Sequence, residues 1–399
     1  METTQTPQCI GLALSGGGVR ATTFHLGVLS RLAADECLEK VSHISTVSGG
    51  SLAIALVFSL TRTTWPSSGD FLNSVVPSAK ALLAGHSLEA AYAWRLILNA
   101  WRLRRGRADI LGQALQGLWA VEGTLQDLPD TPRWVINGTT FETGKRWGFS
   151  KQWMGDYRVN YVLEPDFPIA DAVAASAGYP GLIGPLVLKC GKYEWHKLHF
   201  LPGKDEPHKT EPIGQDMKRL FIWDGGVYDN SGLEAVFRPE RGFRHGLEFV
   251  IASDAGASLP EEHRRFKASL LPWQIYTPPS RLVNIAMDQV RSLRARQFVT
   301  HLRAHSQTGV YLKLGNTSEK ILADAKSSLG QYALTTEDLS LDSENAQRAR
   351  SAAAFPTRLC KLTRDQFDDL FQHGYEVADT TLSAYCPTKF RHVPYSTVS

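Results

Sequence analysis

The stretch "STVSGG", residues 45–50, places a single serine, Ser48, directly before two glycines. The residues on either side predict a strand over 41–46 and a helix over 50–60. A sharp turn between a strand and a helix can lift a serine hydroxyl clear of the backbone for nucleophilic chemistry. An ordinary connection, in which Ser48 only caps the helix, fits the same letters. The stretch alone leaves both interpretations open.

A glycine-rich turn precedes it by one strand-turn-helix unit. Residues 8–14 predict a buried strand, and residues 19–32 predict a helix. Between them lies Ser15-Gly16-Gly17-Gly18-Val19-Arg20, whose three glycines cost backbone entropy and therefore suggest a local need. Amides at a helix N-terminus favour an anion. A nucleotide-binding loop would end in Gly-Lys-Ser/Thr, so we expect a transient oxyanion here; a tight turn without a ligand is the alternative.

A third motif can supply the base that a serine nucleophile needs. Asp224-Gly225-Gly226 follows the apolar run 220–223, which is typical of a buried strand. Two strand-turn-helix units predict a parallel sheet, in which such turns meet at the carboxyl edge. A turn aspartate without catalytic function is the alternative. Six histidines after Asp224 would fit the Ser-Asp-His order of α/β-hydrolases, but none lies in an evident glycine-flanked loop: His245, His263, His301, His305, His373 and His392. His25 is expected to pack on its helix.

Together these motifs resemble the patatin-like phospholipase family, with its glycine loop G-G-G-x-R, its nucleophile segment G-x-S-x-G and its acid D-G-G/A. Three further segments, 137–144, 174–181 and 254–256, are similar to secondary motifs of the family, so the resemblance spans about residues 9–256. Thr46 stands where the family usually has the first glycine of the nucleophile segment. A bacterial branch of the family is similar at this place.

The resemblance implies a three-layer α/β fold, with a mostly parallel central sheet between helices. It implies a single domain over residues 1–399, with a core at about 9–256, further C-terminal helices and a strand, and a helical insertion at about 72–120. The implied activity is hydrolysis of an acyl ester in a membrane phospholipid or lysophospholipid, without a cofactor or metal. A catalytically silent lipid-binding or scaffold protein on the same fold is the rival hypothesis.

The resemblance also assigns the site residues. Ser48 would be the nucleophile and Asp224 its base, while the amides of Gly16, Gly17 and Gly18 would form the oxyanion hole. Arg20 and Gly49 would contact the substrate. For Arg20, a salt bridge that fixes the glycine loop is the alternative.

The insertion contains AYAWRLILNAWRLRRGR, residues 91–107. Trp94 and Trp101 are seven residues apart and precede the basic residues Arg102, Arg104, Arg105 and Arg107. Tryptophan beside arginine suits a lipid interface. A helix packed on the core with a solvated basic end fits as well, and both interpretations stay open.

The composition is typical of a folded protein, with 43% hydrophobic and 21% charged residues. A net charge of +3 does not indicate a nucleic-acid partner. The five scattered cysteines contain no CxxC and favour a reducing compartment. The first nine residues show no secretion signal, and the longest apolar run, near 52–60, is too short to span a bilayer. We therefore predict a cytoplasmic protein, with peripheral membrane contact left open; the oligomeric state is not indicated.

The remaining periodicity predicts the other elements. We expect helices at 72–118, 171–177, 280–304 and 364–384, strands at 133–137, 247–253 and 310–314, and surface loops at 202–216 and 315–350. The long basic helix 280–304 is interpreted as a plain surface helix.

Overall fold

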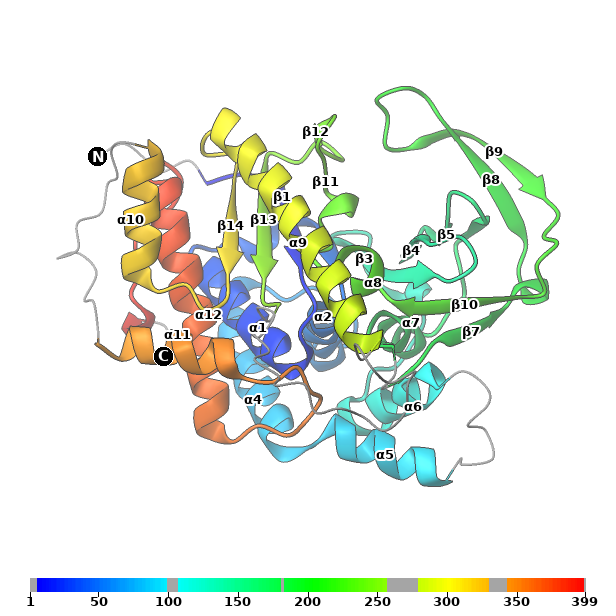
Figure 1. The fold of residues 1–399 in the computed structure, drawn as a ribbon, viewed down its shortest axis with the longest axis horizontal. Helices are drawn as coiled ribbons and strands as arrows, with labels where there is room; N and C mark the ends of the chain where they lie inside the picture. Colours follow the sequence, from blue (N-terminus) through cyan, green and yellow to red (C-terminus); the bar gives the residue numbers. More distant parts are fainter. Residues whose placement is uncertain (1–5, 99–106, 181–182, 257–278, 330–342, 398–399) are drawn as a thin grey trace, which may run out of the picture.

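The computed structural model describes residues 6–98, 107–180, 183–256, 279–329 and 343–397. Its helices cover both faces of one large mixed sheet (Figure 1). The strands are β1 Ile10–Leu14, β2 Val41–Thr46, β3 Arg133–Thr140, β4 Lys145–Phe149, β5 Trp153–Asp156, β6 Asn160–Leu163, β7 Leu186–Lys189, β8 Trp195–Phe200, β9 Pro207–Ile213, β10 Arg219–Asp224, β11 Phe237–Arg238, β12 Gly242–Phe243, β13 Phe249–Asp254 and β14 Gly309–Lys313. The α-helices are α1 Gly18–Ala34, α2 Gly49–Leu60, α3 Ser68–Asp70, α4 Val76–Gly85, α5 Leu88–Leu98, α6 Ala108–Trp119, α7 Ile169–Ser176, α8 Gly226–Asp229, α9 Pro279–Ala304, α10 Ser318–Leu329, α11 Ser343–Ala354 and α12 Arg364–Tyr385.

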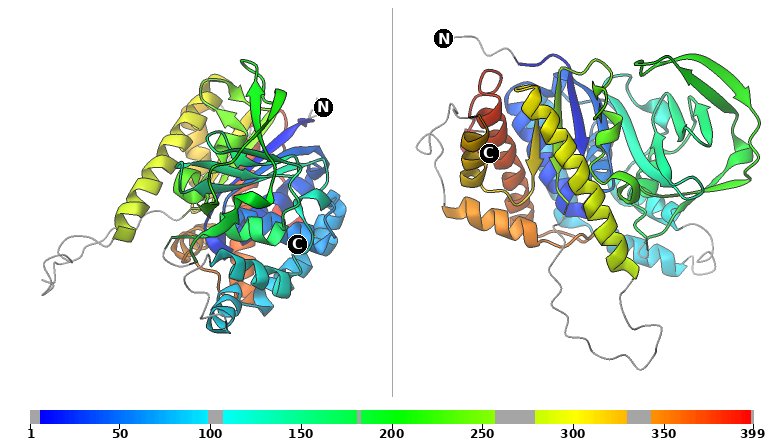
Figure 2. Two further views of the ribbon diagram at one scale, coloured as in Figure 1. Left: turned by 90° about the vertical axis from the view of Figure 1, so that its right-hand side faces the viewer. Right: turned by 45° about the horizontal axis from the view of Figure 1, so that its top comes forward.

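The predicted three-layer α/β fold is confirmed, and β1 shows why it has three layers. The strand order β14-β13-β1-β2-β3 is parallel throughout. Along β1, Leu12 and Leu14 belong to the large core cluster with α1 and α2, whereas Ala13 belongs to a second cluster with Phe298 of α9. Alternate side chains therefore need cover on both faces of the sheet. Figure 2 shows α9 on one side and α1 and α2 on the other.

The sheet continues beyond β3 as an antiparallel extension. Strands β4, β5, β6, β8 and β9 follow in that order, and β10 pairs with both β3 and β7. The predicted loop at 202–216 is wrong in its centre, because β9 pairs with β8 there. The segment of β9, PHKTEPI, is almost wholly exposed, so it carries no hydrophobic alternation that would predict a strand.

Two other element predictions need correction. The expected loop at 315–350 contains α10 and most of α11. Both helices have a polar composition, which hides their apolar face in the sequence. The helical insertion is present, but it is divided: a π-helical turn at Phe71–Val75 precedes α4, and α5 and α6 are separate helices. Residues 99–106 lie outside the described residues. This range includes Trp101, Arg102, Arg104 and Arg105 of the predicted lipid interface.

The helix that follows the glycine loop, α1, packs very closely against α12. A Cβ atom added to Gly27 would lie 2.0 Å from the carbonyl oxygen of Phe371, and one added to Gly374 would lie 2.1 Å from that of Phe24. Two glycines therefore bring the two backbones into contact. Beside this crossing, the buried guanidinium of Arg31 pairs with the carboxylate of Asp379 at 2.7 Å.

We expect Gly374→Ala to lower the free energy of unfolding by about 1–3 kcal/mol, because the added methyl group meets backbone that cannot move aside. Urea unfolding followed by circular dichroism measures this change. Gly85→Ala at the end of α4 is the matched control, because no atom lies within 4 Å of its added Cβ. Equal stability of the two variants would contradict the close crossing.

Candidate active site

Ser48 lies at a sharp turn between β2 and α2. Its backbone has φ 47° and ψ −111°, which is a strained conformation for a residue other than glycine. Its side chain makes no capping hydrogen bond with α2, so the helix-cap interpretation is not supported. Its amide donates a hydrogen bond to the hydroxyl of Ser176 at 3.0 Å, and this bond holds the turn in place. The partly exposed hydroxyl is left for chemistry.

The two glycines after Ser48 allow two turns to touch. A Cβ atom on Gly49 would lie 2.5 Å from the carbonyl oxygen of Gly18, and one on Gly50 would lie 2.4 Å from that of Leu14. Any larger residue would therefore separate the serine turn from the glycine loop. Gly49 is buried and does not line the cavity beside Ser48, so this packing role replaces its predicted contact with substrate.

Thr46, the departure from the usual glycine, is fixed by a buried polar network. Its hydroxyl accepts a hydrogen bond from the indole of Trp134 and contacts the hydroxyl of Ser51, both at 2.9 Å. Ser51 in turn contacts the hydroxyl of Ser176 at 2.9 Å. The threonine therefore ties the strand end to the same serine that holds the Ser48 amide.

The glycine loop presents a restricted set of amides. The amide of Gly16 donates to the carbonyl oxygen of Asn230 at 3.1 Å, and that of Val19 donates to the carbonyl oxygen of Arg358 at 2.9 Å. The amides of Gly17 and Gly18 have no acceptor within the described part of the chain. The prediction of an oxyanion hole therefore concerns the amides of Gly17 and Gly18, because the Gly16 amide already donates to Asn230.

Asp224 ends β10 at the same edge of the sheet. Its carboxylate accepts a hydrogen bond from the amide of Gly226 at 2.6 Å, and it lines the same cavity as Ser48. Burial raises its pKa from 3.8 to about 7, although the Gly226 amide and the neighbouring Ser48 hydroxyl act to lower it. Gly225 allows the approach, since an added Cβ would lie 2.4 Å from the carbonyl oxygen of Asn137. A carboxylate with this pKa suits a general base near neutral pH.

A cavity of about 380 Å³ joins these groups. It contains Ser48, Asp224 and the three loop glycines, and the other lining residues are Ala177, Tyr179, Ile183, Asn230, Gly256, Asn284, Met287, Asp288, Arg291, Thr357, Arg358 and Leu359. The last seven belong to α9 and to the segment 355–363, which joins α11 to α12. Sequence reasoning missed them because they belong to no motif. The interpretation of α9 as a plain surface helix was wrong.

Arg20 does not reach the cavity. It is fully buried, and its guanidinium donates to the carbonyl oxygens of Phe355 and Ala255, at 2.5 and 3.0 Å, and to the hydroxyl of Thr357 at 3.2 Å. Burial, with a smaller effect of Arg291, lowers its pKa to about 10. The predicted substrate contact of Arg20 is therefore replaced by a positioning role. It ties the helix of the glycine loop to two carbonyl oxygens and a hydroxyl. Among the described residues it forms no salt bridge, so this part of the alternative interpretation is wrong.

The described histidines do not line the cavity, and His263 lies outside the described residues. His25 is packed as expected: its ring contacts the hydroxyl of Ser253 and the carbonyl oxygen of Ser15, both at 2.9 Å, and burial lowers its pKa to about 4. Over the ranges that the structure covers, no cluster of His, Cys, Asp and Glu could hold a metal ion.

Within the same ranges, every helix is too short or too polar to cross a membrane.

Comparison with known proteins finds similar sequences in fungi. A patatin-like phospholipase domain-containing protein of Aspergillus clavatus is 30% identical over 184 residues, which cover 45% of this chain and 23% of that protein. A protein of the same name from Coccidioides immitis is 30% identical over 183 residues, with 45% and 22% covered. The matched part is thus less than a quarter of the length of these fungal relatives.

The fold is also found in a solved structure, human GIVD cytosolic phospholipase A2. The likeness has a TM-score of 0.52 at 12% identity and covers 95% of this chain and 61% of that one. The family model named patatin-like phospholipase matches residues 12–237. Because this match covers more than half of the chain, the chain belongs to the patatin-like phospholipase family.

Proposed function

We propose that this protein hydrolyses an acyl ester of a membrane phospholipid or lysophospholipid through a Ser48–Asp224 dyad. The observation that carries the proposal is the pairing of a strained, partly exposed serine with a buried carboxylate whose pKa is about 7. Each feature costs stability, and the two together activate a nucleophile. The family supports a lipid ester as the substrate class.

The chemistry follows from the positions of the groups. The oxygen of Ser48 attacks the ester carbonyl, and Asp224 accepts the proton of the Ser48 hydroxyl in the same step. The amides of Gly17 and Gly18 bind the resulting oxyanion, an effect of about 3–4 kcal/mol for each donor. The intermediate collapses to an acyl-serine, and the proton passes from Asp224 to the departing alcohol. Water then attacks the acyl-serine in the same way and releases the fatty acid.

A silent lipid-binding protein on this fold is the second candidate. It would have no chemical need for a strained serine next to a carboxylate of raised pKa. A fluorophosphonate probe separates the two candidates, because it labels an activated serine covalently. We expect labelling of the wild type and none of Ser48→Ala.

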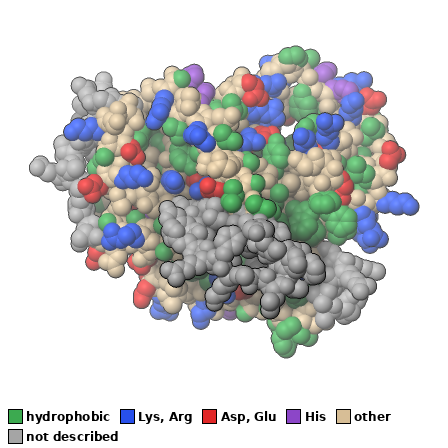
Figure 3. All heavy atoms as spheres, viewed as in Figure 1, with side chains coloured by type: hydrophobic (Ala, Val, Ile, Leu, Met, Phe, Trp, Pro, Cys, Tyr) green, Lys and Arg blue, Asp and Glu red, His purple; other side chains and the backbone are tan. Residues whose placement is uncertain are grey.

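An exposed apolar surface beside the cavity supports contact with a membrane. Leu282, Val283 and Ile285 of α9 are 55%, 38% and 39% exposed, and they lie within a few residues of Asn284 and Met287, which line the cavity. In Figure 3, hydrophobic side chains gather near the middle of the face that carries α9. On α5, the side chains of Trp94, Ile97 and Leu98 are also well exposed. Such a surface suits peripheral binding to a lipid interface.

The dyad predicts strong non-additivity. Ser48→Ala and Asp224→Asn should each lower kcat/KM by a factor on the order of 10⁴, and the double variant should be little worse, because the two groups act as one unit. Initial rates on a short-chain ester measure this. Asp216→Asn, an exposed aspartate near β10, is the control and should keep the wild-type rate. A nearly full rate for Asp224→Asn would favour a different base.

The dyad also predicts a pH dependence. Because Asp224 must be ionised to accept a proton, kcat/KM should rise with pH through an apparent pKa of about 7 and level off above it. A pH–rate profile on a short-chain ester, whose own ionisation does not change, measures this limb. A profile flat between pH 5 and 9 would show that Asp224 does not act as the base.

The interface predicts a difference between substrates. Leu282→Gln combined with Ile285→Gln should slow hydrolysis of phospholipid vesicles more than hydrolysis of a monomeric short-chain ester, because less apolar surface enters the lipid. Leu201→Gln, on the β8–β9 hairpin and 50% exposed, is the control. Equal slowing on vesicles and on the monomeric ester would mean that these residues support the fold and do not bind lipid.

A further inference from the structure

One exposed cation stands at the rim of the catalytic cavity. Of the residues lining that cavity in the described ranges, Arg291 and Arg358 carry positive charge. Arg291 is only 8% exposed and pairs with Asp254 at 3.5 Å and with Asp288 at 3.4 Å. The side chain of Arg358 is 57% exposed. Arg358 is therefore the cavity cation that an incoming ligand meets.

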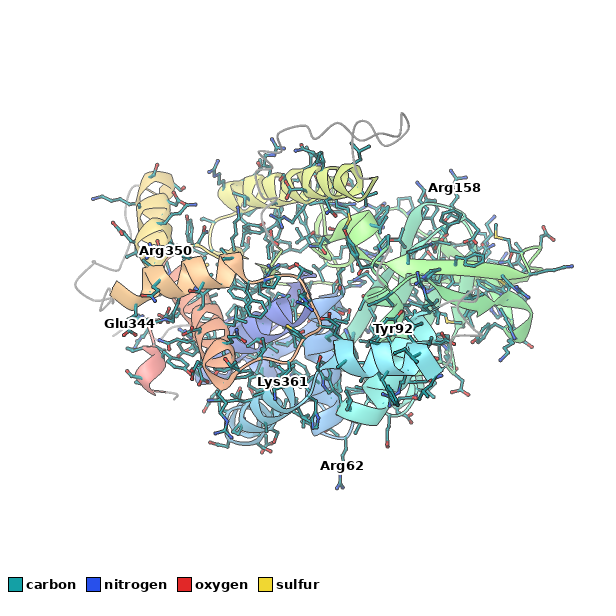
Figure 4. All side chains as sticks on the ribbon, turned by 60° about the horizontal axis from the view of Figure 1, so that its bottom comes forward. Arg62, Tyr92, Arg158, Glu344, Arg350 and Lys361 are labelled. Atoms are coloured by element: carbon teal, nitrogen blue, oxygen red, sulfur yellow. The ribbon has the colours of Figure 1, made fainter. Side chains whose placement is uncertain are left out.

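The backbone that carries Arg358 is held firmly in place. Its carbonyl oxygen accepts the amide of Val19 in the first turn of α1, and a Cβ added to Gly18 would lie 2.4 Å from the same oxygen. The carbonyl oxygen of the next residue, Leu359, accepts the amide of Glu89 at 2.9 Å. Figure 4 shows this segment, which carries Lys361, on the same side of the molecule as α5, which carries Tyr92. The segment therefore touches the glycine loop itself.

The guanidinium of Arg358 holds a carboxylate at two points. Its Nη2 lies 2.7 Å from Oε1 of Glu89, and its Nε lies 3.2 Å from Oε2. The Glu89 side chain is 40% exposed, so water and salt screen the pair and it contributes little to stability. The same forked geometry fits two oxygens of a phosphate. The guanidinium of Arg358 can therefore exchange the Glu89 carboxylate for a phosphate by a change of its side-chain conformation.

We propose that Arg358 binds the phosphate of the ester substrate: its guanidinium leaves Glu89, which does not line the cavity, and turns to the phosphate in the cavity. The proposal rests on the proposed function, since it assigns the substrate's phosphate to the same cavity. In a glycerophospholipid the phosphate lies only a few bonds from the acyl esters. A phosphate receptor must therefore lie within reach of the oxyanion amides. The backbone of Arg358 contacts the first turn of α1, and Arg358 lines the cavity, so its long side chain starts beside these amides. Arg20 cannot serve, because it is buried.

The test compares two substrates with identical acyl esters, one with and one without a phosphate. Dihexanoyl phosphatidylglycerol and dihexanoylglycerol are used as monomers, which removes any effect of membrane binding. The measured quantity is the ratio of kcat/KM for the first to kcat/KM for the second. Arg133→Gln is the matched control, because Arg133 also forms an exposed ion pair, with Glu206, but does not line the cavity.

The two members of the pair should act in opposite directions. Arg358→Gln should lower the ratio about tenfold or more, because a charge-assisted hydrogen bond to the phosphate is lost. Glu89→Gln should raise the ratio by up to about fivefold, because the competing carboxylate is gone. Arg133→Gln should leave it unchanged.

Opposite changes of the ratio in Arg358→Gln and Glu89→Gln distinguish phosphate binding from a purely structural role of this ion pair. If the pair only holds the segment in place, both substitutions will lower kcat/KM for both substrates alike, and the proposal is overturned. A ratio unchanged in Arg358→Gln, with both substrates still hydrolysed, overturns it as well while leaving the proposed function intact. If the wild type hydrolyses neither substrate and resists the fluorophosphonate probe, the proposed function fails first. Circular-dichroism melts verify that each variant is folded.

Discussion

The structure of the site depends on one close approach between two backbones. The serine turn and the glycine loop touch where an added Cβ on Gly49 would lie 2.5 Å from the carbonyl oxygen of Gly18. This contact brings the serine turn against the loop whose Gly17 and Gly18 amides are proposed to bind the oxyanion. Because only hydrogen fits in that space, the glycines are a geometric condition for the chemistry. The parallel order β1-β2-β3 supplies the other condition, since it brings both turns to one edge.

The same site opposes stability in two ways. Ser48 keeps a backbone conformation that most residues avoid, and Asp224 keeps a carboxyl group away from water. Because burial raises the folded-state pKa of Asp224 from 3.8 to about 7, the folded protein binds this proton more tightly than the unfolded chain does. The contribution of Asp224 to the free energy of unfolding is therefore most favourable at low pH and falls as pH rises through that interval. The polar network around Ser176 and the α1–α12 crossing contribute stability that offsets the strain at Ser48 and the burial of Asp224.

The parts that could be predicted from sequence are those whose chemistry is local. The strand at 41–46, the turn at Ser48 and the helix after it follow from one short stretch, because hydrophobic periodicity and glycines act over a few residues. The hairpin strand β9 could not be predicted, since its exposed residues lack alternation. Neither could the engagement of the Gly16 amide by the carbonyl oxygen of Asn230, nor the burial of Arg20. Both depend on segments more than 200 residues away along the chain, which no local pattern reports.

The two halves of the cavity have different origins in the chain. The groups proposed for chemistry, Ser48, Asp224 and the loop glycines, lie within the family match at residues 12–237. The opposite wall comes from α9 and the segment 355–363, both beyond that match. Arg20 joins the halves physically, because it lies in the glycine loop's own helix and binds Phe355 and Thr357. The proposed nucleophile and the opposite wall are thus supplied by different parts of the chain. Substrate choice should therefore be sought in the side chains that this wall presents to the cavity, whereas its backbone and Thr357 also hold the glycine loop in place.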